Sequence, residues 1–464
     1  MLRNGSRFWK AFFQPRPRPA PRRLPRPLLQ VEILEDRTVP STLFLTVNNL
    51  GDTGAGTGTK GDLRYCIHQA NSNPSSPAVI TFAPGLSGTI TLVMGELDIT
   101  DPNLNVLGPG AGVITVSGNN ASRVFDIEAG SSVGLSGLTI ANGHTTGDGL
   151  PDGKNEGGGI FNKGTLNLAN AVVRGNTAEG FLLLQDGQGG GIFSSGPLKA
   201  AFVVVQHNTA GGGLANTNGE GGGIYSKAAF NLFASQVQTN TAKNTNQGGG
   251  IFAAGTSSIS ASTIQNNQGT GIDLNAGSDN SRIWASQIGN NSDNGIALSS
   301  TNHDTVQGNV LAGNKGGIKL QSATYIAITF NQVYSNNQAG IYLNNSSNNT
   351  VNANYIYQNG QDGVQLAGSN NNAISFNVIV HNGSNGIELM FSNGNSIRNN
   401  LVLSNGNDGI LLDAASSGNT VQGNFMFGNH KFDAEDDSLG GGTAGTANTW
   451  TGNARGTASP SGLH

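Results

Sequence analysis

The sequence predicts an all-β fold, a solenoid of the single-stranded parallel β-helix type, and three observations predict it. First, the C-terminal half repeats every 23 residues: GIKL begins at Gly317, and GIYL, GVQL, GIEL and GILL follow at Gly340, Gly363, Gly386 and Gly409. Second, each repeat holds three short apolar segments in which Ile, Val and Leu alternate with polar residues, as in β-strands. Third, Gly and Asn occupy the corners, where a positive φ is needed. A short fixed period indicates that each repeat covers its neighbour's apolar face.

Asparagine recurs with the same period. One series is Asn331, Asn354, Asn377 and Asn400, and a second, five residues later in each coil, is Asn336, Asn359, Asn382 and Asn405. Side-chain amides at one place in successive coils can hydrogen-bond along the stack, as Asn ladders do elsewhere. We therefore interpret these asparagines as structural, with ligand binding as the alternative.

The composition agrees with a folded, acidic body. Only 11% of the 464 residues are charged and 70 are Gly, but the apolar residues are periodic rather than depleted, unlike those of a disordered chain. Eight Lys and Arg precede residue 31, which leaves 16 basic against 28 acidic residues beyond it. An acidic body lacks the basic surface that nucleic acid requires. The single cysteine, Cys66, cannot form an internal disulfide and does not indicate a redox compartment.

Residues 1–41 are expected to be a basic leader, disordered or removed by processing. Arg alternates with Pro between residues 15 and 27, which gives an extended charged segment. The apolar patch at residues 8–13 is interrupted by Lys10 and is too short for an ordinary signal peptide. No stretch of the sequence predicts a transmembrane segment. The residues VEILEDRTVPS, which end at Ser41, resemble a leader of large bacterial envelope proteins; a disordered basic arm is the alternative.

Residues 42–78 are expected to form an N-terminal cap with a short helix. Asp62 is a suitable N-cap residue. The apolar residues that follow at helical spacing on one face are Leu63, Cys66, Ile67 and Ala70. Such a helix would cover the end of the solenoid, where core and unpaired strands are otherwise exposed.

Residues 79–430 are expected to form about 15 coils of about 23 residues each. The spacing divides them into irregular coils (79–156), glycine-rich coils (157–270) and regular coils (271–430). The glycine-rich coils carry GGGI[FY] at Gly157, Gly189, Gly221 and Gly248. Their extra residues lie between an NTA sequence and the next triple glycine, so these coils should extrude loops from one common edge. Residues 431–464 are expected to be a C-terminal cap and tail, anchored by Trp450.

Several of these motifs resemble those of right-handed parallel β-helix proteins of the pectin-lyase-like superfamily. The segment from Leu63 resembles the CSLREA-type segment of secreted bacterial β-helix proteins, although Tyr65 and Cys66 depart from its Glu and Ala. The GGGI[FY] and NTA units resemble repeats of polymorphic surface proteins, and the repeats are also similar to those of NosD-type periplasmic proteins. The resemblance covers most of residues 43–455. It implies a right-handed solenoid, an extracellular or cell-envelope location in bacteria, and polysaccharide as the class of partner.

The first candidate site is a column of aromatic residues just after the GI pair of the glycine-rich coils. Its members are Phe161, Phe193, Tyr225 and Phe252. Side chains that point outward would form a strip on which sugar rings could stack, with the spacing of neighbouring strands. A register shifted by one residue would instead turn them into the core. The sequence allows both interpretations.

The second candidate site consists of acidic residues along the extruded loops. They are Asp148, Asp152, Glu156, Asp186 and Glu220. Glu156, Gln188 and Glu220 each precede a triple glycine and should stack, which places the two glutamates about 9–10 Å apart. That separation is at the outer limit for an inverting carboxylate pair and too large for a retaining one. Oxygen ligands of this kind suit Ca²⁺; the alternative is that they are solvated loop acids.

A third column continues through the regular coils and contains no repeating catalytic residue type. Its members are Asp273, Ala297, Lys319, Tyr342, Gln365, Glu388 and Leu411. The motifs of glycosidases and mannuronan epimerases of this fold are missing, so no catalytic residue can be named. Copper, which the likeness to NosD-type proteins suggests, would need a Met or Cys cluster that the sequence lacks.

The sequence favours a secreted or envelope-attached β-helix protein that binds polysaccharide or another cell-surface partner without catalysis. The first alternative is a calcium-dependent polysaccharide lyase or uronate epimerase, because lyase sites are spatial and leave little trace in sequence. The second is a purely structural surface protein. Capped ends would favour a monomer.

Overall fold

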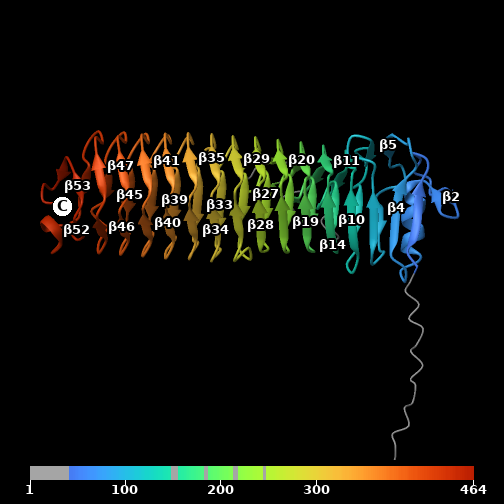
Figure 1. Ribbon diagram of the computed structural model, residues 1–464, viewed down its shortest axis with the longest axis horizontal. Coiled ribbons are helices and arrows are strands. Elements are labelled where there is room, and N and C mark those ends of the chain that lie inside the picture. The colour runs from blue at the N-terminus through green and yellow to red at the C-terminus, as the bar shows by residue number, and fades with distance from the viewer. Residues whose placement is uncertain (1–40, 148–154, 182–185, 213–217, 244–246) are drawn as a thin grey trace, which may run out of the picture. The chain divides into compact units, whose positions relative to one another are not determined.

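A computed structural model describes residues 41–464 except 148–154, 182–185, 213–217 and 244–246. These residues form a right-handed parallel β-helix whose three long parallel sheets, named A, B and C, run along the solenoid (Figure 1). Sheets B and C each contain 15 strands among the described residues, so the predicted fold class and the approximate coil number are confirmed. The described residues include no helix long and apolar enough to cross a membrane.

Each regular coil gives one strand to each sheet. In the coil that starts at β36 (Ile318–Gln321) of sheet C, β37 (Ala327–Thr329) joins sheet A and β38 (Gln332–Tyr334) joins sheet B. Strands of successive coils pair in register, as Ile318 does with Ile341. Ile328 and Val333 point inward and are fully buried. The 23-residue period therefore makes every position of a coil into a column along the solenoid.

The strand bounds follow this repeat. Sheet C comprises β6 (Leu97–Ile99), β9 (Phe125–Ile127), β13 (Ile160–Asn162), β18 (Ile192–Ser194), β23 (Ile224–Ser226), β27 (Ile251–Ala253), β30 (Ile272–Leu274), β33 (Ile296–Ser299), β36, β39 (Ile341–Asn344), β42 (Val364–Ala367), β45 (Ile387–Met390), β48 (Ile410–Leu412), β51 (Ala434–Asp436) and β54 (Ala458–Ser459). Sheet B comprises β5 (Gly88–Thr91), β8 (Ile114–Ser117), β11 (Thr139–Ala141), β15 (Val172–Arg174), β20 (Val204–Gln206), β25 (Gln236–Gln238), β29 (Thr263–Gln265), β32 (Gln287–Gly289), β35 (Val310–Ala312), β38, β41 (Tyr355–Tyr357), β44 (Val378–Val380), β47 (Leu401–Leu403), β50 (Phe425–Phe427) and β53 (Ala454–Arg455).

Sheet A also includes the strands of the N-terminal end. It comprises β1 (Leu43–Val47), β2 (Gly56–Thr57), β3 (Lys60–Gly61), β4 (Ala78–Phe82), β7 (Leu104–Leu107), β10 (Ser132–Ser136), β14 (Thr165–Ala169), β19 (Leu198–Ala201), β24 (Phe230–Phe233), β28 (Ser257–Ser260), β31 (Arg282–Trp284), β34 (Thr305–Gln307), β37, β40 (Thr350–Asn352), β43 (Ala373–Ser375), β46 (Ser396–Arg398), β49 (Thr420–Gln422) and β52 (Thr449–Thr451).

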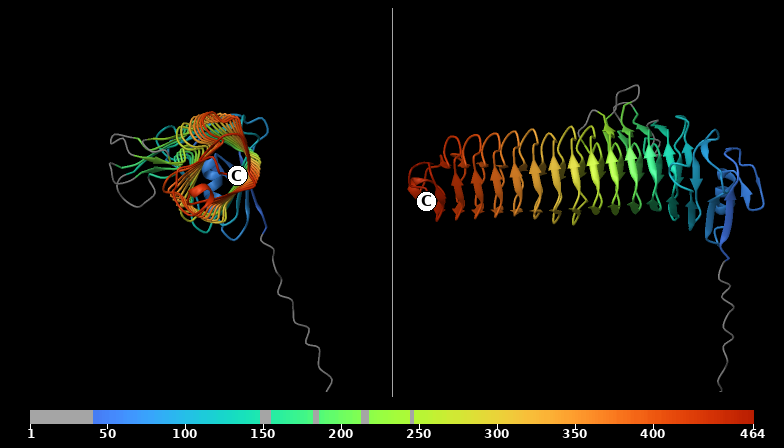
Figure 2. Two further views of the ribbon diagram at one scale, coloured as in Figure 1. Left: turned by 90° about the vertical axis from the view of Figure 1, so that its left-hand side faces the viewer. Right: turned by 45° about the horizontal axis from the view of Figure 1, so that its top comes forward.

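The glycine-rich coils, and the end of the irregular coil before them, extrude further short strands between sheets B and C. Two small parallel sheets result, one of β12 (His144–Thr146), β16 (Thr177–Glu179), β21 (Thr209–Ala210) and β26 (Thr241–Ala242), and one of β17 (Gly187–Gln188) and β22 (Gly219–Glu220). Viewed along the solenoid, the coils superimpose and the extruded segments leave at one corner (Figure 2). The prediction that the extra residues leave from a common edge is confirmed.

Buried asparagines form hydrogen-bonded ladders at the corners. Asn354 donates its backbone N–H and its side-chain Nδ2 to Oδ1 of Asn377, at 2.9 and 3.0 Å, and donates Nδ2 also to the carbonyl of Ile328. The ladder of Asn336 repeats these bonds between sheets B and C. A third ladder, which the sequence analysis did not single out, passes through Asn372 and Asn395 between sheets C and A. The ladders satisfy backbone groups that the corners would otherwise bury unpaired.

The predicted N-terminal helix is present as α1 (Leu63–Asn71). The Asp62 carboxylate accepts a hydrogen bond from the backbone N–H of Tyr65 at 2.8 Å, as an N-cap does. The four apolar residues of its predicted inner face are all buried in the main core. Burial raises the pKa of the Cys66 thiol to about 11, so the thiol stays protonated at neutral pH and packs as a small hydrophobic side chain.

The sheets continue further toward the C-terminus than the spacing suggests. Strands β51 to β54 lie beyond residue 430, in the segment expected to be a cap and tail. The asparagine ladders continue there, because Asn419 donates to Asn448 and Asn424 to Asn453. Ladder partners in this last coil are 29 residues apart instead of 23, so the 23-residue period does not predict it. Trp450 is buried at this end and donates its ring N–H to Asp436 at 2.8 Å.

The ladders predict a large loss of stability when one rung is removed. Asn377→Ala leaves the buried N–H groups of Asn354 without their acceptor and the carbonyl of Val351 without a donor. Each buried unsatisfied group costs about 1–3 kcal/mol, so we expect the free energy of unfolding to fall by about 3 kcal/mol or more. Urea denaturation followed by circular dichroism measures it. Asn337→Ala is the control, because Asn337 is exposed; equal losses in the two variants would contradict the structural role of the ladder.

Candidate functional site

The outward residues of sheet C form one column along the solenoid. In each strand of this sheet the second residue points outward, between two residues that face the core, as Phe161 does between Ile160 and Asn162. In-register pairing makes a single column of Asp98, Asp126, Phe161, Phe193, Tyr225, Phe252, Asp273, Ala297, Lys319, Tyr342, Gln365 and Glu388. We call it the sheet C column. It joins the first and third candidate columns of the sequence analysis.

The four aromatic residues of this column point outward, but they are covered. Ring centroids of Phe193, Tyr225 and Phe252 are 5.2 and 4.8 Å apart, and none of the four side chains is more than 6% exposed. Charged groups lie on the rings: Arg123 and Lys163 over Phe161, and Lys227 over Phe193 and Tyr225. The rings therefore form a small apolar cluster outside the main core, and an open strip for sugar stacking is not present here.

The predicted loop acids are only partly brought together. Asp148 and Asp152 lie outside the described residues. Glu156 pairs with Gln188, and Gln188 with Glu220, so the expected stack is present. Lys227 reaches Glu156 at 3.5 Å, and Gln188 donates to Glu220 at 2.7 Å. Burial raises the pKa of both glutamates.

Asp186 is tied to the neighbouring coil through its backbone, and the charge of its carboxylate contributes to the raised pKa of Glu220. Asn155 donates its side-chain Nδ2 to the carbonyl oxygen of Asp186 at 2.7 Å. Of the loop acids that the structure describes, Glu156 and Glu220 pair in register with Gln188, and Asp186 lies close enough to Glu220 to act on its pKa.

A charged cluster at the N-terminal end of the sheet C column was not foreseen. Arg123 is 4% exposed and contacts Glu96 at 2.7 Å and Asp126 at 3.3 Å, and it donates to the carbonyls of Glu156 and Gly157. Lys163 contacts Asp126 at 3.2 Å and Glu128 at 2.7 Å. A hollow of about 560 Å³ lies beside this cluster and is also lined by His144.

Three carboxylates of this cluster could hold a cation. One oxygen from each of Glu96, Asp98 and Asp126 lies within 4.8 Å of the others, which no other such group of three does in the described part of the chain. Hard carboxylate oxygens suit Ca²⁺. Arg123 and Lys163 already neutralise two of the three, however, so a calcium ion would have to displace an existing ion pair. The carboxylate oxygens are therefore ligands of the type that Ca²⁺ prefers, but the negative charge that would attract the ion is already neutralised by Arg123 and Lys163.

Asp273 follows the aromatic cluster in the column, between Phe252 and Ala297. It is 6% exposed, and its Oδ1 is buried without a hydrogen-bond partner among the described residues. Burial, with smaller contributions from the carboxylates of Glu220 and Asp293, raises the pKa of Asp273 to about 7, and Lys319 opposes this rise. Asp273 is therefore largely protonated below neutral pH.

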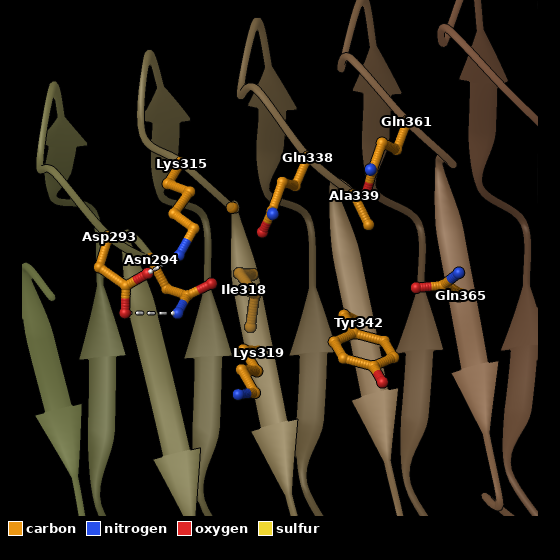
Figure 3. Close-up of a pocket in the computed structure, with 11 residues that line it drawn as sticks. Asp293, Asn294, Lys315, Ile318, Lys319, Gln338, Ala339, Tyr342, Gln361 and Gln365 are labelled. Atoms are coloured by element: carbon orange, nitrogen blue, oxygen red, sulfur yellow. Dashed lines mark hydrogen bonds and ion pairs between the residues drawn. The ribbon is translucent and has the colours of Figure 1, made fainter. Parts of the chain in front are cut away.

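Beyond Ala297 the column opens into a hollow of about 340 Å³. We call it the Lys319 hollow. It lies between two rows, Asp293, Lys315, Gln338 and Gln361 at the corners and Lys319, Tyr342 and Gln365 on the strands (Figure 3). The small residues Gly316 and Ala339 leave room between the rows. The arrangement places two ammonium groups, an aromatic ring and several amides on one open surface.

The two lysines of this hollow differ in their contacts. Lys315 lies 3.2 Å from Asp293, with its own side chain 46% exposed. Exposed pairs of this kind contribute little free energy, so Lys315 can exchange its partner for a ligand anion. Lys319 has no ion-pair partner among the residues that the structure describes. The hollow therefore offers positive charge on a body that is acidic.

Sequence reasoning found one of these rows and missed the other. The sequence predicts that Lys319, Tyr342 and Gln365 share one column, but it indicates no site there, because the column contains no repeated catalytic residue type. The corner row lies two residues before each Gly of the GI mark, as Lys315 lies before Gly317. This regular spacing shows that the corner residues also form a row along the solenoid. Only the fold shows that this row and the strand row line the same hollow.

Fold and site together define a right-handed parallel β-helix protein with an open, polar hollow on one sheet. The model of the family described as periplasmic copper-binding protein (NosD) matches residues 284–457. No curated protein sequence matches the chain.

The chain is similar in structure to several solved β-helix proteins. The Azotobacter vinelandii mannuronan C-5 epimerase AlgE6 A-module has a TM-score of 0.49 at 16% identity, over 88% of this chain and 98% of that one. The periplasmic alginate epimerase AlgG has a TM-score of 0.39 at 15% identity, over 80% and 85%. The Dettilon tailspike protein has a TM-score of 0.43 at 15% identity, over 80% and 64%. At such identities these likenesses concern the fold and assign no activity.

The buried Asp273 predicts a stability that falls as pH rises. Its pKa is raised from 3.8 to about 7 on folding, so the folded state holds a proton that the unfolded state releases. The stability is fully present below about pH 4 and is lost as pH rises through about 7, at about 1.4 kcal/mol per pH unit.

Asp273→Asn removes this titration. We expect the variant to gain stability over the parent between about pH 4 and pH 7 and the gain to level off above about pH 7, as measured by urea unfolding at each pH. Asp279→Asn, at a half-buried residue outside the column, is the control. A constant difference between parent and Asp273→Asn across this range would show that Asp273 is ionised throughout.

Proposed function

We propose that the chain is a non-catalytic polysaccharide-binding protein of the cell envelope or extracellular space, and that it binds an acidic polysaccharide in the Lys319 hollow. The observation that carries the proposal is the placement of Lys315 and Lys319 on the two rows of an open hollow. The rest of the chain beyond residue 30 is acidic, so these two lysines stand out as an anion-binding position.

The groups of the hollow match the groups of an acidic sugar. Ammonium groups bind carboxylates through charge-assisted hydrogen bonds. The amides of Gln338 and Gln365 can both donate to and accept from sugar hydroxyls. The ring of Tyr342 offers an apolar face beside a polar hydroxyl, which suits a sugar ring with the same two-sided character. An open hollow along the solenoid also admits a polymer that continues in both directions.

Catalysis would need a group that accepts a proton, and the hollow offers none that is well placed. The carboxylate that lines it, Asp293, is paired with Lys315 and also accepts hydrogen bonds from Thr270 and Asn294. Asp273 holds its proton up to about neutral pH and is buried beside the hollow rather than in it. General base catalysis requires an ionised or neutral base within hydrogen-bond reach of the substrate proton. Binding is therefore the function that this geometry supports best.

A calcium-dependent lyase or uronate epimerase at the N-terminal cluster is the second candidate. It is favoured by Arg123 and Lys163, each of which contacts two acids beside a hollow. Burial lowers the pKa of Lys163, but hydrogen bonds and charge from Glu128 and Asp126 outweigh it and raise the pKa. A lysine held protonated cannot abstract a proton, and Arg123 is committed to backbone carbonyls. These contacts place the second candidate behind the first.

Copper binding, named in the description of the NosD family, is not part of the proposal. Cu(I) prefers thiolate and thioether ligands. Cys66 lies outside the matched segment. Of the two methionines within it, Met426 is fully buried in the core and Met390 is half-buried on β45, in a different sheet, so the two do not form a cluster. A monomer is proposed because the helix α1 covers one end of the core and the irregular last coil with Trp450 covers the other.

The proposal predicts retention on a polyuronate without cleavage. In affinity electrophoresis through gels that contain polygalacturonate or alginate, the full chain should be retarded, and added salt should weaken the retardation because it screens exposed charges. The length of the polymer should stay unchanged. Lys319→Ala should weaken binding about tenfold, the effect of one lost charge-assisted hydrogen bond.

Lys199→Ala is the matched control, because Lys199 is exposed on sheet A and its loss changes the net charge equally. If the two variants weakened binding equally, the binding would be a non-specific effect of net charge and the Lys319 hollow would not be its site. Calcium-dependent shortening of the polymer that Asp126→Asn abolishes would favour the second candidate.

A further inference from the structure

The outer face of sheet B changes character along the solenoid. In β25 and β29 the outward residues are polar, and Gln238 and Gln265 hydrogen-bond along a ladder that begins at Gln206. In β41, β44, β47 and β50 the first and third residues are all apolar or aromatic, and the middle residues are buried in the core. We call these eight outward residues the sheet B platform. Because the same positions hold glutamine elsewhere, the fold does not require an apolar surface here.

The platform is exposed at its two ends and half-buried between them, where Val380 is buried. Tyr355 is 43% exposed and Phe425 49% exposed. Rings gather at both of its ends: Tyr357 stacks on Tyr334 of β38 at 4.7 Å and on Tyr355 at 4.3 Å, and Phe425 lies 4.5 Å from Phe427. Single exposed apolar residues need no explanation, but a contiguous patch marks an interaction site.

Two corner phenylalanines extend this apolar surface at a conformational cost. Phe330 and Phe376 directly precede the asparagines that lead into β38 and β44, and each is 61% exposed. Their φ angles are 57° and 56°, in a region that favours Gly and Asn. The same corner holds Asn399 and Gly423 in later coils. Neither burial nor backbone geometry therefore accounts for phenylalanine at these two positions.

We propose that the sheet B platform binds an uncharged, extended polysaccharide along the solenoid, at a surface separate from the Lys319 hollow. All eight residues of the platform lack charge, and a surface without charge favours an uncharged partner over an anionic one. Tyr334, Tyr355 and Tyr357 stack their apolar rings on one another, and each ring carries a hydroxyl group. Side chains of this kind suit sugar rings, whose C–H faces alternate with hydroxyls.

The size and geometry of the platform argue against other occupants. Strands β41 to β50 span about 14 Å at the inter-strand spacing, and three residues across a strand add about 7 Å, which gives a face of about 100 Å² before its flanks are counted. A stable dimer buries about 800 Å² on each partner, so a second copy of this chain would be held weakly. A peptide strand adds to the edge of a sheet, where backbone groups are free, and the face offers none.

The test uses the full chain in affinity electrophoresis through gels that contain hydroxyethylcellulose, a soluble uncharged β-glucan. We expect retardation that does not change with salt. Tyr355→Gln combined with Phe425→Gln should weaken it roughly five- to tenfold, as the loss of two aromatic contacts would. Glutamine is chosen because Gln332 occupies the same column as Tyr355, so the variant should fold; circular dichroism checks this. Tyr355→Phe should retain most of the binding.

Matched variants separate this proposal from the polyuronate site. Tyr342→Gln on sheet C should leave the retardation by hydroxyethylcellulose unchanged, and the platform variant should leave polygalacturonate binding unchanged. Absence of retardation, or equal loss with Tyr342→Gln, would overturn the proposal. So would sedimentation that shows a dimer which the platform variant dissociates, or binding of the parent, but not of the platform variant, to phosphatidylcholine vesicles.

Discussion

The structure depends on hydrogen bonds that run from coil to coil at the corners. Parallel strands of successive coils pair through their backbones, but a corner leaves N–H and carbonyl groups pointing into a buried space. Asparagine resolves this, because its side chain accepts from the coil before it and donates to the next, as Asn354 and Asn377 do. A coil whose register shifted by one residue would lose these hydrogen bonds, and the inward and outward side chains of its three strands would exchange places. The ladders thus hold each coil in register with the next.

A fixed register turns every coil position into a column, and the columns define the surfaces. Sheet C passes from acids through buried rings to the lysines and glutamines of the Lys319 hollow, while sheet B passes from glutamines to tyrosine and phenylalanine. The inner columns are mostly apolar, because they form the core, and where they hold Asn162, Ser194 and Ser226 these polar groups are buried, with Asn162 hydrogen-bonded to Ser194. The outer columns are free to differ, and their differences are therefore where function is to be sought. Two surfaces of opposite character, one charged and one apolar, would allow one solenoid to hold two kinds of polymer.

Much of the fold could be predicted from local pattern. The period gave the coils, the asparagine spacing gave two ladders, and Asp62 with the apolar residues after it gave helix α1. What escaped prediction depended on contacts between distant residues. The outward direction of Phe161 and its neighbours was one of two open interpretations, and their burial under Arg123, Lys163 and Lys227 could not be read from spacing. The Lys319 hollow was missed because it joins corner and strand residues of different coils. The last coil was missed because its length departs from the period.

Zero-length cross-linking tests the central claim, that an acidic polysaccharide occupies the Lys319 hollow, most directly. A carbodiimide joins carboxylates to amines in direct contact, so treating the full chain with oligogalacturonate should attach sugar to specific lysines that peptide mass spectrometry identifies. The account predicts attachment at Lys315 and Lys319, competed by excess polymer and lowered by salt. Attachment at Lys163 and Lys227 instead, or spread evenly over exposed lysines such as Lys199, would contradict it.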